Sequence, residues 1–167
     1  RLNVYAGLAG GYLLRNGDDP GDGTRLPAPP YEQPLVLQDR MFNADGTFGY
    51  PPNMNPTTPR PWAPEFFGDV ATVNGKIWPT LAVDRGKYRF RVYNGSNARY
   101  YNLKLKSSLG TTLTFVQIGS DGGLLNAPVA LSKLLLGPGE RADLVIDSPP
   151  LPARTLVRLT NAAHVPF

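Results

Sequence analysis

The sequence predicts an all-β Greek-key sandwich with at most a turn or two of helix, and three observations favour this fold class. Residues 87–105 alternate apolar and basic side chains with a period of two, which is typical of half-buried strands. Glycine and proline, at 18 residues each, favour strands and turns over helices. The 167 residues, 41% of them apolar, are enough for one domain with a substantial core.

The segment 87–105 is the centre of the predicted fold. In its first half, tyrosine, phenylalanine and valine point to one side, and lysine and arginine point to the other. Asn94-Gly95 supplies residues that tolerate a positive φ, so the chain turns there. In the second half, tyrosine and leucines alternate with lysines. We expect the two strands to form a hairpin within one sheet, with the basic faces in solvent.

The segments before this centre predict a strand, a linker and a second strand. Leu2–Leu14 is apolar and rich in small residues, which indicates a buried strand approached closely by another backbone. Asn16–Pro30 is rich in Gly, Asp and Pro and is typical of a linker. A calcium loop is the alternative there, but the twelfth-position Glu of an EF-hand is absent. Pro34–Arg40 predicts a short strand, in which we interpret Asp39 and Arg40 as a structural polar pair.

The next segments predict a surface loop and a hairpin. Pro51–Pro64 is so rich in proline that it favours an irregular loop. The aromatic residues after it either cap the sandwich or serve a function. Val73–Lys76 contains Asn-Gly between strand-like runs, which is a strong hairpin signal. The strand that leads to the centre is expected to begin at Leu81–Val83.

The last third of the chain predicts further strands, which are Thr111–Ile118, Val129–Leu136, Arg141–Ile146 and Thr155–Thr160. Gly119–Gly123 predicts a sharp turn in which Asp121 accepts backbone N–H groups. A phosphate or metal loop is the alternative, but no helix N-terminus follows it. In the strand that begins at Arg141, Asp143 and Asp147 are expected to point outward.

Composition excludes several kinds of chemistry. The chain contains no Cys, so it has no disulfide and no thiolate metal site, and His164 is its only histidine. Its net charge of +4 is scattered, which does not favour binding to nucleic acid. No apolar run approaches the ~20 residues of a membrane-spanning helix, so no membrane partner is expected.

Several long motifs carry a resemblance to a known family. They are Arg1–Leu14, Pro34–Pro51, VNGKIWP (Val73–Pro79), YRFRVYNGSNARYYNL (Tyr88–Leu103), IGSDGGLL (Ile118–Leu125) and GERADLVID (Gly139–Asp147). In this order they resemble the second cupredoxin-like domain of bacterial multicopper oxidases, in the group of spore-coat laccases and bilirubin oxidases. The resemblance implies a cupredoxin-like Greek-key β-sandwich.

The resemblance also implies how the chain is divided. Residues 1–15 correspond to the terminal strand of a preceding domain, 16–30 to a linker, and 31–167 to a middle domain whose final strand is missing. First and third cupredoxin domains of the parent chain are then the expected partners. Self-association through the strand Leu2–Leu14 and an open sheet edge is a further hypothesis.

In this family the copper ligands come from the first and third domains. The parent enzyme is therefore expected to contain copper, to oxidise phenolic, bilin or metal donors and to reduce dioxygen to water. The fragment itself is expected to be structural, copper-free and inactive. An alternative is a domain of a copper-free structural or partner-binding relative, and a weaker one is an adhesion or carbohydrate-binding module. The sequence itself does not reveal the location, and the resemblance implies an extracellular, periplasmic or spore-coat one.

No catalytic residue and no metal ligand is assigned within the chain. The resemblance instead implies that five residues line the substrate pocket of the intact enzyme, namely Pro64, Phe66, Phe67, His164 and Val165. The other interpretations of His164 are an exposed loop residue and, least favoured, a copper ligand.

Overall fold

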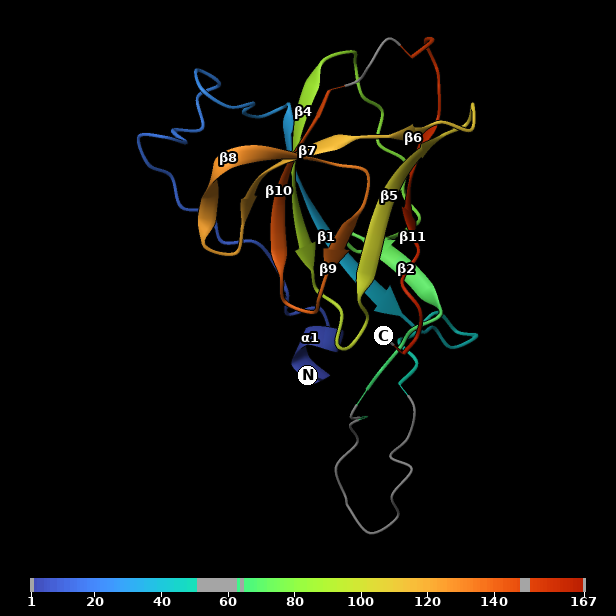
Figure 1. Ribbon diagram of the computed structural model, residues 1–167. Coiled ribbons are helices and arrows are strands. Elements are labelled where there is room, and N and C mark those ends of the chain that lie inside the picture. Colours follow the sequence, from blue (N-terminus) through green and yellow to red (C-terminus); the bar gives the residue numbers. More distant parts are fainter. Residues whose placement is uncertain (1, 51–62, 64, 148–150, 167) are drawn as a thin grey trace.

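The computed structural model describes residues 2–50, 63, 65–147 and 151–166, and their regular structure is almost entirely strand (Figure 1). The one helix among the described residues is α1 (Leu2–Tyr5). The strands are β1 (Glu32–Arg40), β2 (Val70–Val73), β3 (Lys76–Ile77), β4 (Lys87–Asn94), β5 (Tyr101–Ser107), β6 (Thr112–Leu113), β7 (Phe115–Ser120), β8 (Gly123–Leu131), β9 (Leu134–Leu136), β10 (Arg141–Asp147) and β11 (Val157–Asn161).

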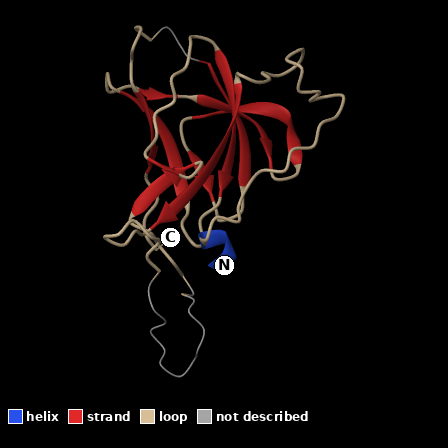
Figure 2. Cartoon of the chain, turned by 180° about the vertical axis from the view of Figure 1, so that it is seen from behind, coloured by secondary structure: helices blue, strands red, loops and turns tan. Residues whose placement is uncertain are grey.

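The strands form two sheets, which confirms the predicted fold class. A large seven-stranded sheet has the order β3-β2-β1-β4-β10-β7-β8. A small four-stranded sheet has the order β11-β5-β6, and β9 also pairs with β5. The large sheet is mixed, because β1 and β4 run parallel while its other pairs are antiparallel. In Figure 2, which views the molecule from the side opposite to Figure 1, the strands of this sheet fan out, as expected for strongly twisted strands.

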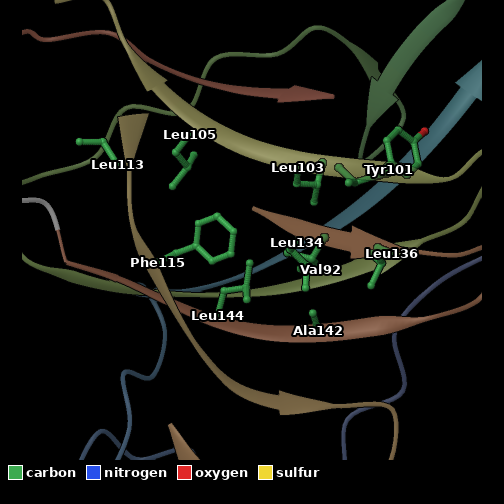
Figure 3. Packing of buried hydrophobic residues seen from close by; sticks show 11 residues of the cluster. Val92, Tyr101, Leu103, Leu105, Leu113, Phe115, Leu134, Leu136, Ala142 and Leu144 are labelled. Atoms are coloured by element: carbon green, nitrogen blue, oxygen red, sulfur yellow. The ribbon is translucent and has the colours of Figure 1, made fainter. Parts of the chain in front are cut away.

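The core lies between the sheets. Its buried side chains come from both of them: Leu37, Val92, Tyr101, Leu103, Leu105, Leu113, Phe115, Leu134, Leu136, Ala142 and Leu144. In β5 the predicted alternation is confirmed, since every second residue from Tyr101 to Ser107 is buried. Figure 3 shows the Phe115 ring between Leu105 of the small sheet and Leu144 of the large sheet.

The central hairpin was predicted wrongly. β4 lies in the large sheet and β5 lies in the small sheet, so the two strands face each other across the core. A strand buries its apolar face by packing against a second sheet and not by pairing within the plane of its own sheet, and six residues, 95–100, connect the two strands. The predicted strand Thr111–Ile118 is also divided between the sheets, as β6 and β7.

Local turn signals were more reliable than the predicted strand ends. Asn74 and Gly75 have φ values of 51° and 77°, and they join β2 to β3 in the expected two-residue hairpin. No strand begins at residues 81–83, because the chain becomes regular only at Lys87. The strand expected over Leu2–Leu14 is absent. The segment forms α1 and then a run without regular structure, which pairs with no strand of either sheet.

Candidate functional site

Four of the five residues predicted to line a pocket lie within the described part of the chain. Phe66 is buried, with 2% of its surface exposed, and Phe67 is half-buried. His164 and Val165 are exposed near the C-terminus. Pro64 lies outside the described residues.

Phe66 belongs to an aromatic cluster rather than to an open wall. Its ring packs edge-on against Tyr5 of α1, with the ring centroids 4.5 Å apart, and stacks on Tyr50 at 5.1 Å. The Tyr5 hydroxyl lies within hydrogen-bonding distance of the carbonyls of Met41 and Gly49, and its oxygen accepts a hydrogen bond from the Met41 N–H. Burial raises the pKa of Tyr5, so this phenol stays neutral and acts as a hydrogen-bond donor. The N-terminal helix α1 therefore packs against Phe66 through Tyr5.

The residue after the two phenylalanines is held by an ion pair. Asp39 Oδ2 accepts a 2.7 Å hydrogen bond from the Gly68 N–H and a 2.9 Å bond from Arg99 Nε. Arg99 Nη2 donates to the Gly68 carbonyl at 2.6 Å. The predicted pairing of Asp39 with Arg40 is wrong, because the Asp39 carboxylate lies against Arg99 instead.

Arg40 has a different environment from the one predicted. Its guanidinium lies over the rings of Tyr5 and Phe48, at 5.0 and 5.5 Å. It donates to the Asp39 and Val4 carbonyls, the second at 3.5 Å. Burial lowers its pKa, and carbonyl dipoles and aromatic faces together offset part of the cost of burying the cation. Arg40 thus joins α1 to β1.

Two of the three basic residues on one side of β4, Arg89 and Arg91, are largely shielded from solvent, which is the largest correction to the sequence analysis, whereas Lys87 is exposed. Arg89 is fully buried, and Asp143 is 7% exposed although it was expected to point outward. Three arginines and three carboxylates form one cluster, which consists of Arg15, Asp19, Glu32, Arg89, Arg91 and Asp143. The segment around Asp19, expected to be a free linker, covers this face and supplies a central carboxylate.

Geometry makes this ion cluster tight. Arg89 Nη1 and Nη2 contact both oxygens of Asp19 at 2.8 and 2.9 Å, while its Nε donates to Asp143 at 2.9 Å. Arg91 reaches Asp19 at 2.5 Å and also contacts Glu32. Burial by itself raises the pKa of Asp19, but hydrogen bonds and charge from Arg89 and Arg91 outweigh it and hold that pKa well below its usual range. Burial also raises the pKa of Glu32 by itself, but hydrogen bonds and charge from Arg15 and Arg91 outweigh it and lower that pKa.

The glycine-rich turn after β7 contains Asp121, whose predicted role as an acceptor of a backbone N–H is confirmed. Asp121 Oδ1 accepts a 2.7 Å hydrogen bond from the backbone N–H of Arg141, and its carbonyl accepts one from the Arg141 guanidinium at 2.9 Å. Asp121 therefore joins the β7–β8 turn to the start of β10. This pair lies at the surface, with about half of each side chain exposed.

The donor set does not fit a copper centre. Copper sites of oxidases use several imidazoles, and one type of site needs a thiolate. This chain has one histidine and no cysteine, and within the described ranges no three His, Asp or Glu side chains are placed to hold a metal ion together. We therefore derive no redox step from these residues. In the same part of the chain, no helix has the length and apolar character needed to cross a bilayer.

The sequence analysis missed two features of this region: the contact of Arg99 with Asp39 and Gly68, and the buried ion cluster. Arg99 and Gly68 gave no signal beyond a single Arg in a loop and a Gly after two phenylalanines. For the ion cluster the sequence did contain a signal. Arg89 and Arg91 lie on one side of β4, and acidic residues lie in β1 and β10, the two strands that pair with β4. Only knowledge of strand order would have converted that pattern into a contact.

Comparison with known proteins identifies relatives over nearly the whole chain. No family model matches. A laccase of Bacillus subtilis (strain 168) is 45% identical over 98% of this chain, and a multicopper oxidase, LPR1, of Arabidopsis thaliana is 40% identical over all of it. A crystal structure of a variant of the McoA multicopper oxidase from Aquifex aeolicus superposes with a TM-score of 0.86 over 98% of this chain, at 33% identity.

The chain spans about a third of each of these relatives. It corresponds to 31% of the Bacillus laccase, 28% of the Arabidopsis protein and 34% of the Aquifex chain.

Proposed function

This chain belongs to the multicopper oxidase family as one of its cupredoxin-like domains, and on that premise we propose that it is the scaffold domain of a laccase-like enzyme. One observation carries the proposal. The likeness to copper oxidases covers 98% of the chain, yet the chain has a single histidine and no cysteine. Such a domain contributes architecture, and other domains of the parent contribute the copper ligands.

The parent enzyme would take single electrons from phenolic, bilin or metal donors at one copper. It would then reduce dioxygen to water at a copper cluster elsewhere in the protein. The chain described here would hold its neighbouring domains at a fixed spacing. Two features suit that role: the N-terminal segment is fastened by the ion cluster, and α1 is packed against the loop that carries Phe66.

The same domain would line part of the donor pocket. The half-buried Phe67 is the best candidate among the described residues, because its ring is held in place yet partly open to solvent. Aromatic walls suit phenolic and bilin donors, which bind by stacking and burial. His164 and Val165 would line the pocket from the C-terminal segment. Phe66 supports this wall from behind.

Copper analysis of the purified chain, paired with a dye-oxidation assay, tests the proposal. We expect neither stoichiometric copper nor turnover from this chain. We expect bound copper and turnover from the intact parent protein. Tightly bound copper with turnover in the isolated chain would refute the scaffold role. A parent without His-X-His pairs and a His-Cys-His segment would instead support a copper-free partner-binding relative.

A further inference from the structure

We infer that Asp39 and Arg99 are positioning residues for the Phe67 ring, and that they thereby determine which donors the proposed pocket accepts. The part of this inference that concerns donors rests on the proposed function. The part that concerns geometry rests on the described contacts alone.

The ion pair holds both backbone polar groups of one residue. Asp39 accepts from the Gly68 N–H, and Arg99 donates to the Gly68 carbonyl. Arg99 Nε also contacts the same oxygen of Asp39, which closes a ring of three charge-assisted hydrogen bonds. Asp39 is 2% exposed, so water competes little with these bonds.

The close approach of the β1 backbone to residue 68 requires glycine at this position. A Cβ added at Gly68 would lie 2.5 Å from the backbone N and O atoms of Arg40. Backbone atoms of β1 cannot move aside as the end of a flexible side chain can. The loop therefore lies against β1 only because residue 68 has no side chain.

This fixed residue follows directly after the two phenylalanines, whose rings occupy different surroundings. Phe66 is buried against Tyr5 and Tyr50. The Arg99 guanidinium lies over the Phe67 ring, 5.7 Å from its centroid. The guanidinium that binds the Gly68 carbonyl thus also contacts the Phe67 ring, so one side chain sets both the loop backbone and the ring.

The pair itself is anchored in both sheets. The Asp39 N–H donates to Ser96 Oγ at 3.1 Å, and Ser96 Oγ lies 2.9 Å from the Tyr101 hydroxyl at the start of β5. Asp39 Oδ1 is buried with no hydrogen-bond partner in the structure as described. A buried, half-satisfied carboxylate is a poor way to stabilise a fold, which favours a positioning role for it.

Hydrogen exchange of the Gly68 amide in this chain tests the geometric part. We expect Asp39→Asn and Arg99→Lys to accelerate Gly68 exchange about 10- to 100-fold, while exchange of β4 amides is unchanged, since hydrogen bonds to charged groups are the stronger class. Asp121→Asn and Arg141→Lys are matched controls at an exposed ion pair and should leave Gly68 exchange unchanged. Unchanged exchange in both Asp39→Asn and Arg99→Lys would overturn the inference. Arg99→Lys is the milder change and remains informative if Asp39→Asn does not fold.

Steady-state kinetics of the intact parent tests the donor part. We expect Arg99→Lys to raise KM for a bulky phenolic donor about 5- to 10-fold, with kcat and the KM for a metal-ion donor unchanged. Phe67→Leu should reproduce this effect without accelerating Gly68 exchange. Equal losses for both donors, or a parent that oxidises neither, would overturn the donor role, and the exchange result would still decide the geometric one.

Discussion

Replacing Asp143 by Asn should destabilise the chain far more than the same change at Asp147, four residues along β10. Both carboxylates face basic residues of β4. Asp143 is 7% exposed and contacts the fully buried Arg89, whereas Asp147 lies 3.9 Å from Lys87 with about two thirds of each side chain exposed. The two substitutions remove the same charge from one strand and differ in burial.

The expected magnitude follows from what is left behind. After Asp143→Asn, the buried cluster holds three arginines and two carboxylates, and Arg89 Nε faces an amide in place of a carboxylate. Breaking a buried ion pair by removing one partner costs about 3–5 kcal/mol. Because Asn keeps one acceptor oxygen and Asp19 still faces Arg89, we expect about 3 kcal/mol, or a fall in Tm of about 6–12 °C. Asp147→Asn should cost at most about 0.5 kcal/mol.

Urea denaturation at neutral pH, followed by far-ultraviolet circular dichroism, measures both free energies of unfolding. The m-values of the variants should match that of the unsubstituted chain, which would show that the substitution changes stability and not the compactness of either state. If the two variants differ by less than about 0.5 kcal/mol, the cluster contributes no more than a surface pair and the reasoning fails.

Further outcomes are expected from the same structure. Because the folded-state pKa of Asp19 lies below its unfolded value, its stabilisation is present above about pH 4 and is lost as pH falls towards the folded pKa; urea midpoints measured down to about pH 2 should fall less in Asp19→Asn. Burial raises the pKa of Tyr101 to about 12, so stability from this phenol persists below about pH 10 and is lost as pH rises towards 12, which ultraviolet titration measures. Gly75→Ala should cost about 1 kcal/mol for its φ of 77° alone, since open space surrounds the site, and Gly68→Ala should cost more because its Cβ would meet backbone; equal losses in urea titrations would contradict this. Phe115→Ala should cost about 3–5 kcal/mol by the same measurement, since this ring is 1% exposed, and a loss under about 1 kcal/mol would contradict its place in the core.

The parts of the fold that were predicted correctly are those whose cause is local. The buried face of β5 follows from a period of two that any strand imposes on its side chains. The β2–β3 hairpin follows from Asn74 and Gly75, which adopt positive φ at small cost. The turn after β7 likewise follows from its glycines, whereas the hydrogen-bond donor to Asp121 is Arg141, 20 residues later.

The parts that were predicted wrongly depend on partners distant in sequence. A period of two does not reveal which strand lies beside β4, and its neighbours prove to be β1 and β10. The alternation also marks Arg89 as outward without showing what covers that side. Asp19, 70 residues earlier, covers it and converts an expected surface charge into a buried one.

By itself, the sequence determined the kind of domain: short alternating strands, tight turns, kinship with copper oxidases, and too few imidazoles and thiols for a copper centre. The tertiary structure alone decided the role of each charge. It placed Arg89 and Asp143 in the interior and Asp39 against Arg99 instead of against Arg40. The physical reason is that the interaction energy of a charge and the cost of burying it both rise as water is removed from it. How much water is removed depends on segments that pack together only when the chain folds.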